Sequence, residues 1–199
     1  MCVWFPSRRR SLAGRFFCVS GRQKCLPPEG KGEGDTSAPA KTDMDKRNET
    51  PIVVCDIDGT ISLVGPARAA MLQSENPDWD AFYEDPFDDE PVEKVCRLVG
   101  HLSRQHRIVF CTSRRDSVRE KTAGWLSRHL GTDAFPNGFD LLMRRGKDPR
   151  PDTVVKPELL QERLREDGLG KDSVTCILED SASMVRMWDN LGYNCLLVA

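Results

Sequence analysis

Residues 52–60, Ile-Val-Val-Cys-Asp-Ile-Asp-Gly-Thr, constrain the fold of this 199-residue chain more than any other stretch. A short apolar run that ends in a turn is typical of a buried parallel strand, and open α/β sheets bind ligands where their strands end. Strand alternation places the side chains of Asp56 and Asp58 on one side of the chain. Two carboxylates so close repel each other unless a metal ion joins them or one holds a proton, so the stretch predicts a chemical site.

Two simpler interpretations of this stretch must be weighed. Asp-Gly is a common turn signal, so a lone Asp-x-Asp also fits a solvated loop. An EF-hand calcium loop begins in the same way, but it requires a glycine at its sixth position and an acid at its twelfth. Those positions hold Ile61 and Ala67, which excludes a calcium site of that kind.

The composition bounds the class of protein. A formal net charge of −2 and a hydrophobic share of 39% fit one globular domain with some unstructured chain. This charge excludes a uniformly basic nucleic-acid coat but leaves room for a local basic groove. No apolar run approaches the ~18–20 residues that a membrane-spanning helix needs. Four of the eight cysteines lie in apolar strand-like runs and none forms Cys-x-x-Cys, which indicates buried thiols in a reducing, cytoplasmic setting.

Residues 1–48 differ from the rest of the chain. The first 28 residues contain arginine and lysine but no acid, and a Gly-, Ser- and Pro-rich stretch follows. Such a composition cannot bury enough apolar surface to become ordered. An arginine-rich, acid-poor start also fits a transit peptide, and translation from Met44 is a third interpretation. We favour disorder or a misplaced start for residues 1–48, and we assign residues 49–199 to the folded domain.

Apolar runs with strand character recur along that domain and alternate with helical patterns. The expected strands after the first are residues 107–111, 139–143, 174–178 and 193–198. Helical apolar periodicity falls between them, for example over residues 91–105. Strands that alternate with helices predict an α/β fold with a Rossmann-like, doubly wound parallel sheet.

Polar side chains follow the second of these strands. Thr112, Ser113 and Arg114 come directly after the apolar run. A hydroxyl at a strand tip can donate a hydrogen bond to a phosphate oxygen, and an arginine can add a bidentate clamp. An ordinary polar loop is the alternative interpretation.

Two further groups of residues carry charge at the tips of expected elements. Lys156 precedes Pro157 at an expected helix start, where the helix dipole already favours an anion and a lysine is unfavourable. That placement indicates a phosphate ligand. Glu179 and Asp180 follow the strand 174–178, and adjacent acids at a strand tip match the oxygen ligands of a hard cation.

The order of these groups resembles the four motifs of the haloacid dehalogenase superfamily of phosphotransferases. Residues 152–156 and 178–199 further resemble the 3′-phosphatase domain of phage-type polynucleotide kinase–phosphatases, and the resemblance covers residues 51–199. No Gly-x-x-x-x-Gly-Lys-Ser/Thr loop of a kinase partner occurs. Two positions depart from the pattern, because Ser113 replaces a glycine and Glu179 replaces an aspartate.

The resemblance implies a magnesium site. Its ligands would be Asp56, Asp180, the backbone carbonyl of Asp58, and Glu179 through water. Mg²⁺ suits such a sparse set because it keeps several waters and uses only one or two carboxylates.

The resemblance also implies roles in catalysis. Asp56 would attack phosphorus and form an aspartyl-phosphate, and Asp58 would act as the general acid and then as the general base. Lys156 and Thr112, with Ser113 at the same strand tip, would hold the transferring oxygens. Arg114 would steady the phosphate or the rest of the substrate, and Asp152 would orient Lys156 by pairing with it.

The superfamily carries a cap or flap between its first two motifs, which corresponds to residues 61–90 here. We expect a short helix over residues 66–74 and a small lid that carries Trp79, Phe82 and Tyr83. Burial of these aromatic residues against the domain is the alternative. The acids at residues 85–90 are explained as caps of the next helix.

The expected substrate is the 3′-phosphate of a DNA or RNA end, and a free nucleotide or another small phosphate ester is the alternative. The basic residues 144–150 favour a polymer, whereas a closing lid favours a small molecule. A catalytically dead nucleic-acid-binding module is disfavoured because both aspartates of the first motif remain. The sequence predicts no membrane partner and does not predict the oligomeric state.

Overall fold

The computed structural model describes residues 50–71, 73, 75–77, 81–82, 89–131, 135 and 138–198. These residues all belong to one compact unit, Ala40–Ala199. The expectations for residues 1–48, and for Trp79 and Tyr83 of the lid, lie outside the described residues.

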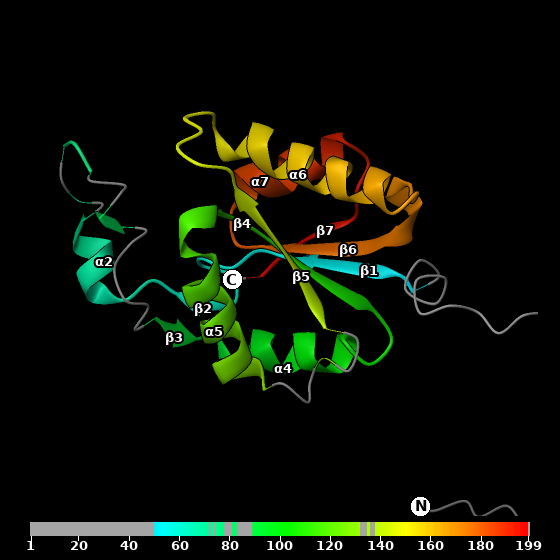
Figure 1. Cartoon of the computed structure of the whole chain (residues 1–199), viewed down its shortest axis with the longest axis horizontal. Helices are drawn as coiled ribbons and strands as arrows, with labels where there is room; N and C mark the ends of the chain where they lie inside the picture. The colour runs from blue at the N-terminus through cyan, green and yellow to red at the C-terminus, as the bar shows by residue number, and fades with distance from the viewer. Residues whose placement is uncertain are drawn as a thin grey trace, which may run out of the picture. The chain divides into compact units, whose positions relative to one another are not determined.

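A five-stranded parallel sheet forms the centre of this unit (Figure 1). Its strands are, in spatial order, β5 (Phe139–Arg144), β4 (Arg107–Arg115), β1 (Ile52–Cys55), β6 (Val174–Glu179) and β7 (Cys195–Leu197). Helices α4 (Glu93–Leu102) and α5 (Arg119–Leu130) cover one face, and α6 (Asp152–Glu166) and α7 (Ala182–Asn190) cover the other. The predicted α/β fold with a doubly wound parallel sheet is confirmed.

The central strand β1 shows why the sequence forms this architecture. Val53 and Cys55 belong to the hydrophobic cluster under α4 and α5, whereas Ile52 and Val54 belong to the cluster under α6 and α7. All four side chains are buried. A strand that is covered on both faces needs apolar residues at every position, which is the pattern that this run shows.

The structure corrects two local predictions. Strand β4 continues to Arg115, so the tip residues 112–114 belong to the strand itself. Helix α6 begins at Asp152, because the amides of Val154 and Val155 already bond to the carbonyl of Pro151 at 2.9 and 3.1 Å. Pro157 therefore lies inside that helix.

The region between β1 and α4 forms a small antiparallel unit in its described part. Strand β2 (Ser62–Leu63) pairs with β3 (Glu90–Pro91), and α2 (Pro66–Met71) follows β2. The helix predicted over residues 66–74 thus ends earlier than expected. Among the described residues, no helix combines the length and the apolar character needed to cross a membrane.

Candidate active site

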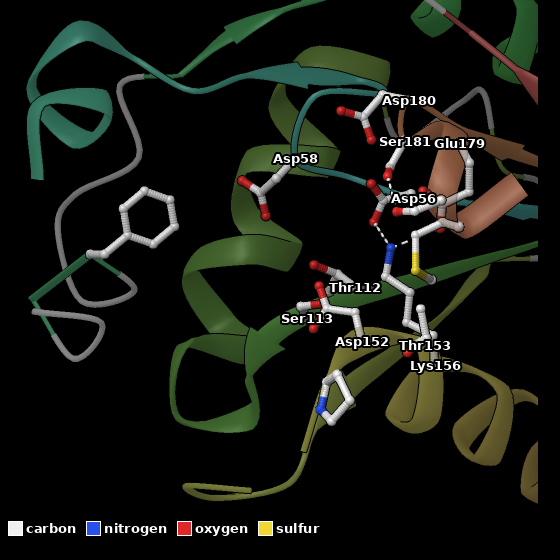
Figure 2. Close-up of a pocket in the computed structure, with 14 residues that line it drawn as sticks. Asp56, Asp58, Thr112, Ser113, Asp152, Thr153, Lys156, Glu179, Asp180 and Ser181 are labelled. Atoms are coloured by element: carbon white, nitrogen blue, oxygen red, sulfur yellow. Dashed lines mark hydrogen bonds and ion pairs between the residues drawn. The ribbon is translucent and has the colours of Figure 1, made fainter. Parts of the chain in front are cut away.

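The polar tips of the strands meet in one pocket at the carboxyl ends of the sheet (Figure 2). The pocket has a volume of about 440 Å³. Eight of the nine predicted site residues line it: Asp56, Asp58, Thr112, Ser113, Asp152, Lys156, Glu179 and Asp180. Arg114, the ninth, lies outside this lining.

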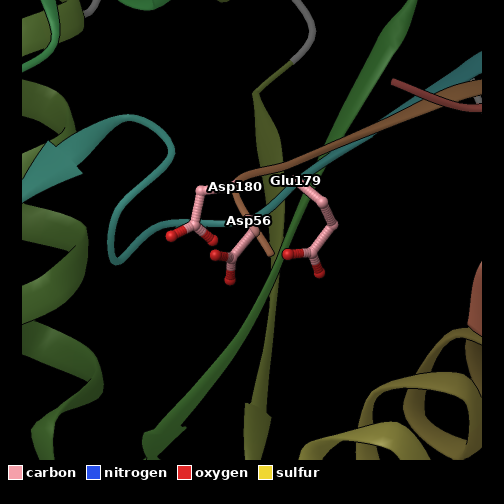
Figure 3. A group of neighbouring side chains, drawn as sticks. All are labelled: Asp56, Glu179 and Asp180. Carbon is pink, nitrogen blue, oxygen red and sulfur yellow. The ribbon is translucent and has the colours of Figure 1, made fainter. Parts of the chain in front are cut away.

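Three carboxylates from two neighbouring strands gather in this pocket. Asp56, Glu179 and Asp180 each offer an oxygen within 4.8 Å of the others (Figure 3). The amide of Asp56 donates to the carbonyl of Leu178 at 3.0 Å, so the pairing of β1 and β6 extends to the tips and brings the acids together. Asp56 and Glu179 are buried, whereas Asp180 is exposed.

The turn after β1 requires a glycine. Gly59 has a φ of 89°, and its amide donates to the carbonyl of Ser62 at 2.8 Å. A Cβ atom at this position would lie 2.0 Å from Oδ2 of Asp180. Gly59 therefore serves both the left-handed turn and the close approach of Asp180.

Lys156 joins two of the acids. Its Nζ donates to Oδ1 of Asp56 at 2.7 Å and to Oε1 of Glu179 at 2.8 Å. Burial alone would lower the pKa of Lys156, but the carboxylates of Asp56 and Glu179 raise it above its ordinary value. The ammonium group is therefore charged, and it lies between the two strand tips.

Two expectations about Lys156 are wrong. It occupies the fifth position of α6 and not the helix start, so the helix dipole does not explain its placement. Asp152 does not orient it, because the carboxylate of Asp152 accepts a hydrogen bond from Nη2 of Arg144. Asp56 and Glu179 orient Lys156 instead.

The acid group carries more negative charge than Lys156 can balance. Burial raises the pKa of Asp56 to about 7 against the opposing attraction of Lys156, and burial also raises the pKa of Glu179. Oε2 of Glu179 is buried and has no hydrogen-bond partner. Three carboxylates and one ammonium group leave a formal charge of −2, so the residues present fit a divalent cation.

Asp58 has a different environment from Asp56. Arg114 donates from Nε to Oδ2 at 2.8 Å and from Nη2 to Oδ1 at 2.7 Å, which is a bidentate pair. Burial alone would raise the pKa of Asp58, but the Arg114 guanidinium holds it below its ordinary value. Arg114 is fully buried and does not line the pocket, whereas Asp58 does. Arg114 therefore positions Asp58 from the protein interior.

Arg68 and Arg114 form a buried network of ion pairs around Asp89, and the sequence did not indicate this role of Asp89. Asp89 accepts hydrogen bonds from Nη1 of Arg68 and, at 3.0 Å, from Nη2 of Arg114. It also accepts from the hydroxyl of Ser62 at 3.1 Å and from the amide of Gly65 at 3.0 Å. The interpretation of Asp89 as a helix cap is wrong, because no side chain caps α4. Nothing in the periodicity around residue 89 indicates a buried acid.

Several pocket hydroxyls were also missed. Thr112 was predicted, and its Oγ1 accepts from the amide of Arg114 at 3.1 Å. Thr153 in the first turn of α6, Ser181 at the N-cap of α7 and Ser183 in the first turn of α7 line the same pocket. Their position just after a loop that follows a strand was the available signal. Phe82, the described residue of the expected lid, lines the pocket and is buried, with the Arg68 guanidinium 4.3 Å from the centre of its ring.

Comparisons with known proteins agree with this geometry. Residues 50–199 match the family model described as the polynucleotide kinase PNKP phosphatase domain. A protein of Autographa californica nuclear polyhedrosis virus, named as a bifunctional polynucleotide kinase/RNA ligase, is 27% identical over 146 residues. This match covers 70% of the chain and 18% of the viral protein, so the chain spans less than a fifth of that relative's length.

Solved structures show the same similarity. A chain from the Pnkp1/Rnl/Hen1 complex is 26% identical with a TM-score of 0.54, and the match covers 75% of this chain and 46% of that one. A haloacid dehalogenase-like hydrolase from Streptococcus pneumoniae is 13% identical with a TM-score of 0.52, over 75% of this chain and 85% of that one. The second likeness concerns the fold alone.

Proposed function

Because the chain belongs to the family of polynucleotide kinase PNKP phosphatase domains, we propose that it removes the 3′-phosphate from a nucleic-acid end in a Mg²⁺-dependent reaction. We further propose that the reaction passes through an aspartyl-phosphate. The observation that carries this proposal is the convergence of Asp56, Glu179, Asp180 and Lys156 in one pocket. The free thiols of the five described cysteines fit the predicted cytoplasmic setting.

Mg²⁺ would be held by Asp56 and Asp180, with Glu179 beside them and the backbone carbonyl of Asp58 as a further oxygen ligand. The unpartnered Oε2 of Glu179 supports a place for this residue in the cation's surroundings. When bound, the cation supplies positive charge that offsets the charge of the phosphate.

Asp56 is the proposed nucleophile. One of its carboxylate oxygens forms a bond to phosphorus, and the bond between phosphorus and the 3′-oxygen breaks. The hydrogen bonds from Lys156 and, at 3.3 Å, from the hydroxyl of Thr60 fix the orientation of the Asp56 carboxylate. The ammonium group of Lys156 also lies beside the phosphoryl group that is transferred, and its positive charge stabilises the negative charge that the phosphoryl oxygens accumulate.

Asp58 is the proposed proton carrier. It protonates the departing 3′-oxygen and later accepts a proton from the water that attacks the aspartyl-phosphate. The bidentate pair with Arg114 favours the ionised form, which suits the second role. The proton for the first role then arrives with a substrate in its monoanionic form, since the second pKa of a phosphate monoester is about 6.

The hydroxyl groups of the pocket provide the remaining contacts to phosphate. Thr112 and Ser113 are neighbouring residues of strand β4, and both line the pocket. Neutral donors on rigid elements hold phosphoryl oxygens without reorganisation during the reaction. We propose the same use for Thr153 and Ser181, which were not expected from the sequence.

The alternative substrate is a free nucleotide or another small phosphate ester. The pocket volume of about 440 Å³ favours it, because this value lies in the range of small-molecule sites, roughly 300–1,000 Å³. The relation to the polynucleotide kinase family and the basic loop beside the pocket favour the polymer.

Phosphate release from matched substrates tests the proposal. A 3′-phosphorylated oligonucleotide, the same oligonucleotide with a 5′-phosphate, and a nucleoside monophosphate are compared with Mg²⁺ and with EDTA. We expect release from the 3′-phosphorylated oligonucleotide only with Mg²⁺, and loss of release in Asp56→Asn but not in the control Asp172→Asn, an exposed acid. Unchanged release by Asp56→Asn would overturn the proposal, and preference for the mononucleotide would favour the alternative.

A further inference from the structure

A second cavity adjoins the catalytic pocket. It also has a volume of about 440 Å³, and Asp152 lines both cavities. Arg115, Arg144, Lys147 and Arg150 supply four cations to its wall, against the two carboxylates of Asp148 and Asp152. The wall therefore carries a formal excess of two positive charges.

The cations of this wall come from two neighbouring strands and from the loop that follows them. Arg115 at the end of β4 pairs in register with Arg144 at the end of β5, so two like charges lie at adjacent strand ends. Asp152 pairs with Arg144, and Asp148 together with Glu158 pairs with Arg150. The wall as a whole has more cations than carboxylates, which favours an anion in this cavity.

Arg144 shapes the loop between β5 and α6. It is buried, and it donates to the carbonyls of Asp148 at 2.9 Å and Arg150 at 2.6 Å. It also donates to the carbonyl of Ser113, at the rim of the catalytic pocket, at 3.3 Å. The buried guanidinium of Arg144 therefore fixes the loop between β5 and α6 against Ser113, which is proposed to bind phosphate. The two cavities thus keep a defined spacing.

We propose that this second cavity binds the phosphodiester on the 5′ side of the terminal nucleotide while the 3′-phosphate occupies the catalytic pocket. The proposal rests on the proposed function, since the position of the strand follows from the position of the reacting phosphate. Cations that meet a backbone phosphate set the register of a nucleic acid without reading its sequence. A nucleoside 3′,5′-bisphosphate offers the same second phosphate, and the experiment separates it from a strand.

The test compares kcat/KM for a nucleoside 3′-monophosphate, a nucleoside 3′,5′-bisphosphate and a 3′-phosphorylated oligonucleotide. The variant is Lys147→Glu, and the matched control is Lys171→Glu, an equal charge change at an exposed lysine in the turn before the amino end of β6. We expect Lys147→Glu to lower kcat/KM for the oligonucleotide about fivefold through KM, which is the upper range for one exposed ion pair. The nucleoside monophosphate should react equally well with both variants.

The dependence on salt gives a second measurement. On a single strand each phosphate contact contributes about 0.7 to the slope of log affinity against log salt concentration, so Lys147→Glu should flatten the slope for the oligonucleotide by about that amount. Equal kcat/KM for monophosphate and oligonucleotide, with no effect of Lys147→Glu, overturns the second site and leaves the phosphatase in place. A bisphosphate that reacts better than the oligonucleotide overturns the strand assignment. Absence of turnover on all three substrates overturns the proposed function and the second site with it.

Discussion

Lys156 donates a hydrogen bond from Nζ to Oδ1 of Asp56 at 2.7 Å, although a hundred positions separate the two residues in the chain. Both side chains are buried. The contact joins the end of β1 to helix α6. It places a permanent cation next to the carboxylate of Asp56, the proposed nucleophile.

We expect Lys156→Met to destabilise the protein and abolish phosphate release. Removal of one partner from a buried ion pair costs about 3–5 kcal/mol, because the carboxylates remain without compensation. Urea unfolding in EDTA measures the loss, and added Mg²⁺ should restore more stability to this variant than to the wild type. The control Lys171→Met changes an exposed lysine and should stay within about 0.5 kcal/mol. A stable variant in EDTA would contradict the prediction.

Gly59→Ala tests the close approach at the turn. The added methyl group would lie 2.0 Å from Oδ2 of Asp180, so the carboxylate of Asp180 must leave its present position beside Asp56 and Glu179. We expect a loss of Mg²⁺ affinity of at least about tenfold, measured by titration calorimetry.

The control for Gly59→Ala is Gly131→Ala. Gly131 has a similar φ of 77°, but a Cβ atom there meets nothing within 4 Å. Both variants place an alanine at a positive φ, which strains the backbone of an L-residue, and only Gly59→Ala disturbs the acids. Equal Mg²⁺ affinity in the two variants would show that Asp180 is not a ligand.

Asp89→Asn tests the buried arginine network. The substitution removes the charge that faces Arg68 and Arg114, and we expect a loss of about 3 kcal/mol in the free energy of unfolding. Arg114 loses the anionic charge of Asp89, so we expect a less fixed orientation of Asp58 and a lower kcat. Glu166→Gln, at a carboxylate with 57% of its side chain exposed, serves as the control. Wild-type kcat in Asp89→Asn would contradict the coupling between this network and Asp58.

The protection that Mg²⁺ gives should grow with pH. Without a cation, the pKa of Asp56 is raised from 3.8 to about 7, so the folded state holds a proton that the unfolded state has released. This contribution to stability is complete below about pH 4 and is lost as pH rises through 7. Mg²⁺ replaces the proton, so the rise in Tm with Mg²⁺ should be larger at pH 8 than at pH 5. Equal rises at both pH values, or a larger one at pH 5, would contradict this account.

The tips of the sheet could be predicted because they depend on local sequence. The apolar run before Asp56 requires a strand that is buried on both sides, and the acids after residue 178 follow a similar run. In a parallel sheet the carboxyl ends of all strands lie on the same side, so the polar residues that follow the strands come close together however the helices pack. This is why eight of nine predicted residues share a pocket.

The partners of those residues could not be predicted in the same way. Asp89 pairs with Arg114 across 25 positions, and Arg144 pairs with Asp152 although a lysine was the expected partner. Both pairings depend on the geometry of loops, which hydrophobic periodicity does not encode. The start of α6 was misplaced for a related reason, since Pro157 is tolerated inside a helix that tertiary contacts stabilise.

Detection of a phosphate group on Asp56 is the most direct test of the account. The protein is mixed with Mg²⁺ and an excess of 3′-phosphorylated oligonucleotide, quenched in acid within the first turnover, and analysed by mass spectrometry of its peptides. We predict one phosphorylated peptide, with the added mass on Asp56 and absent from the Asp56→Asn variant. Release of phosphate in the first turnover with no modified Asp56 in peptides that cover this residue would contradict the account.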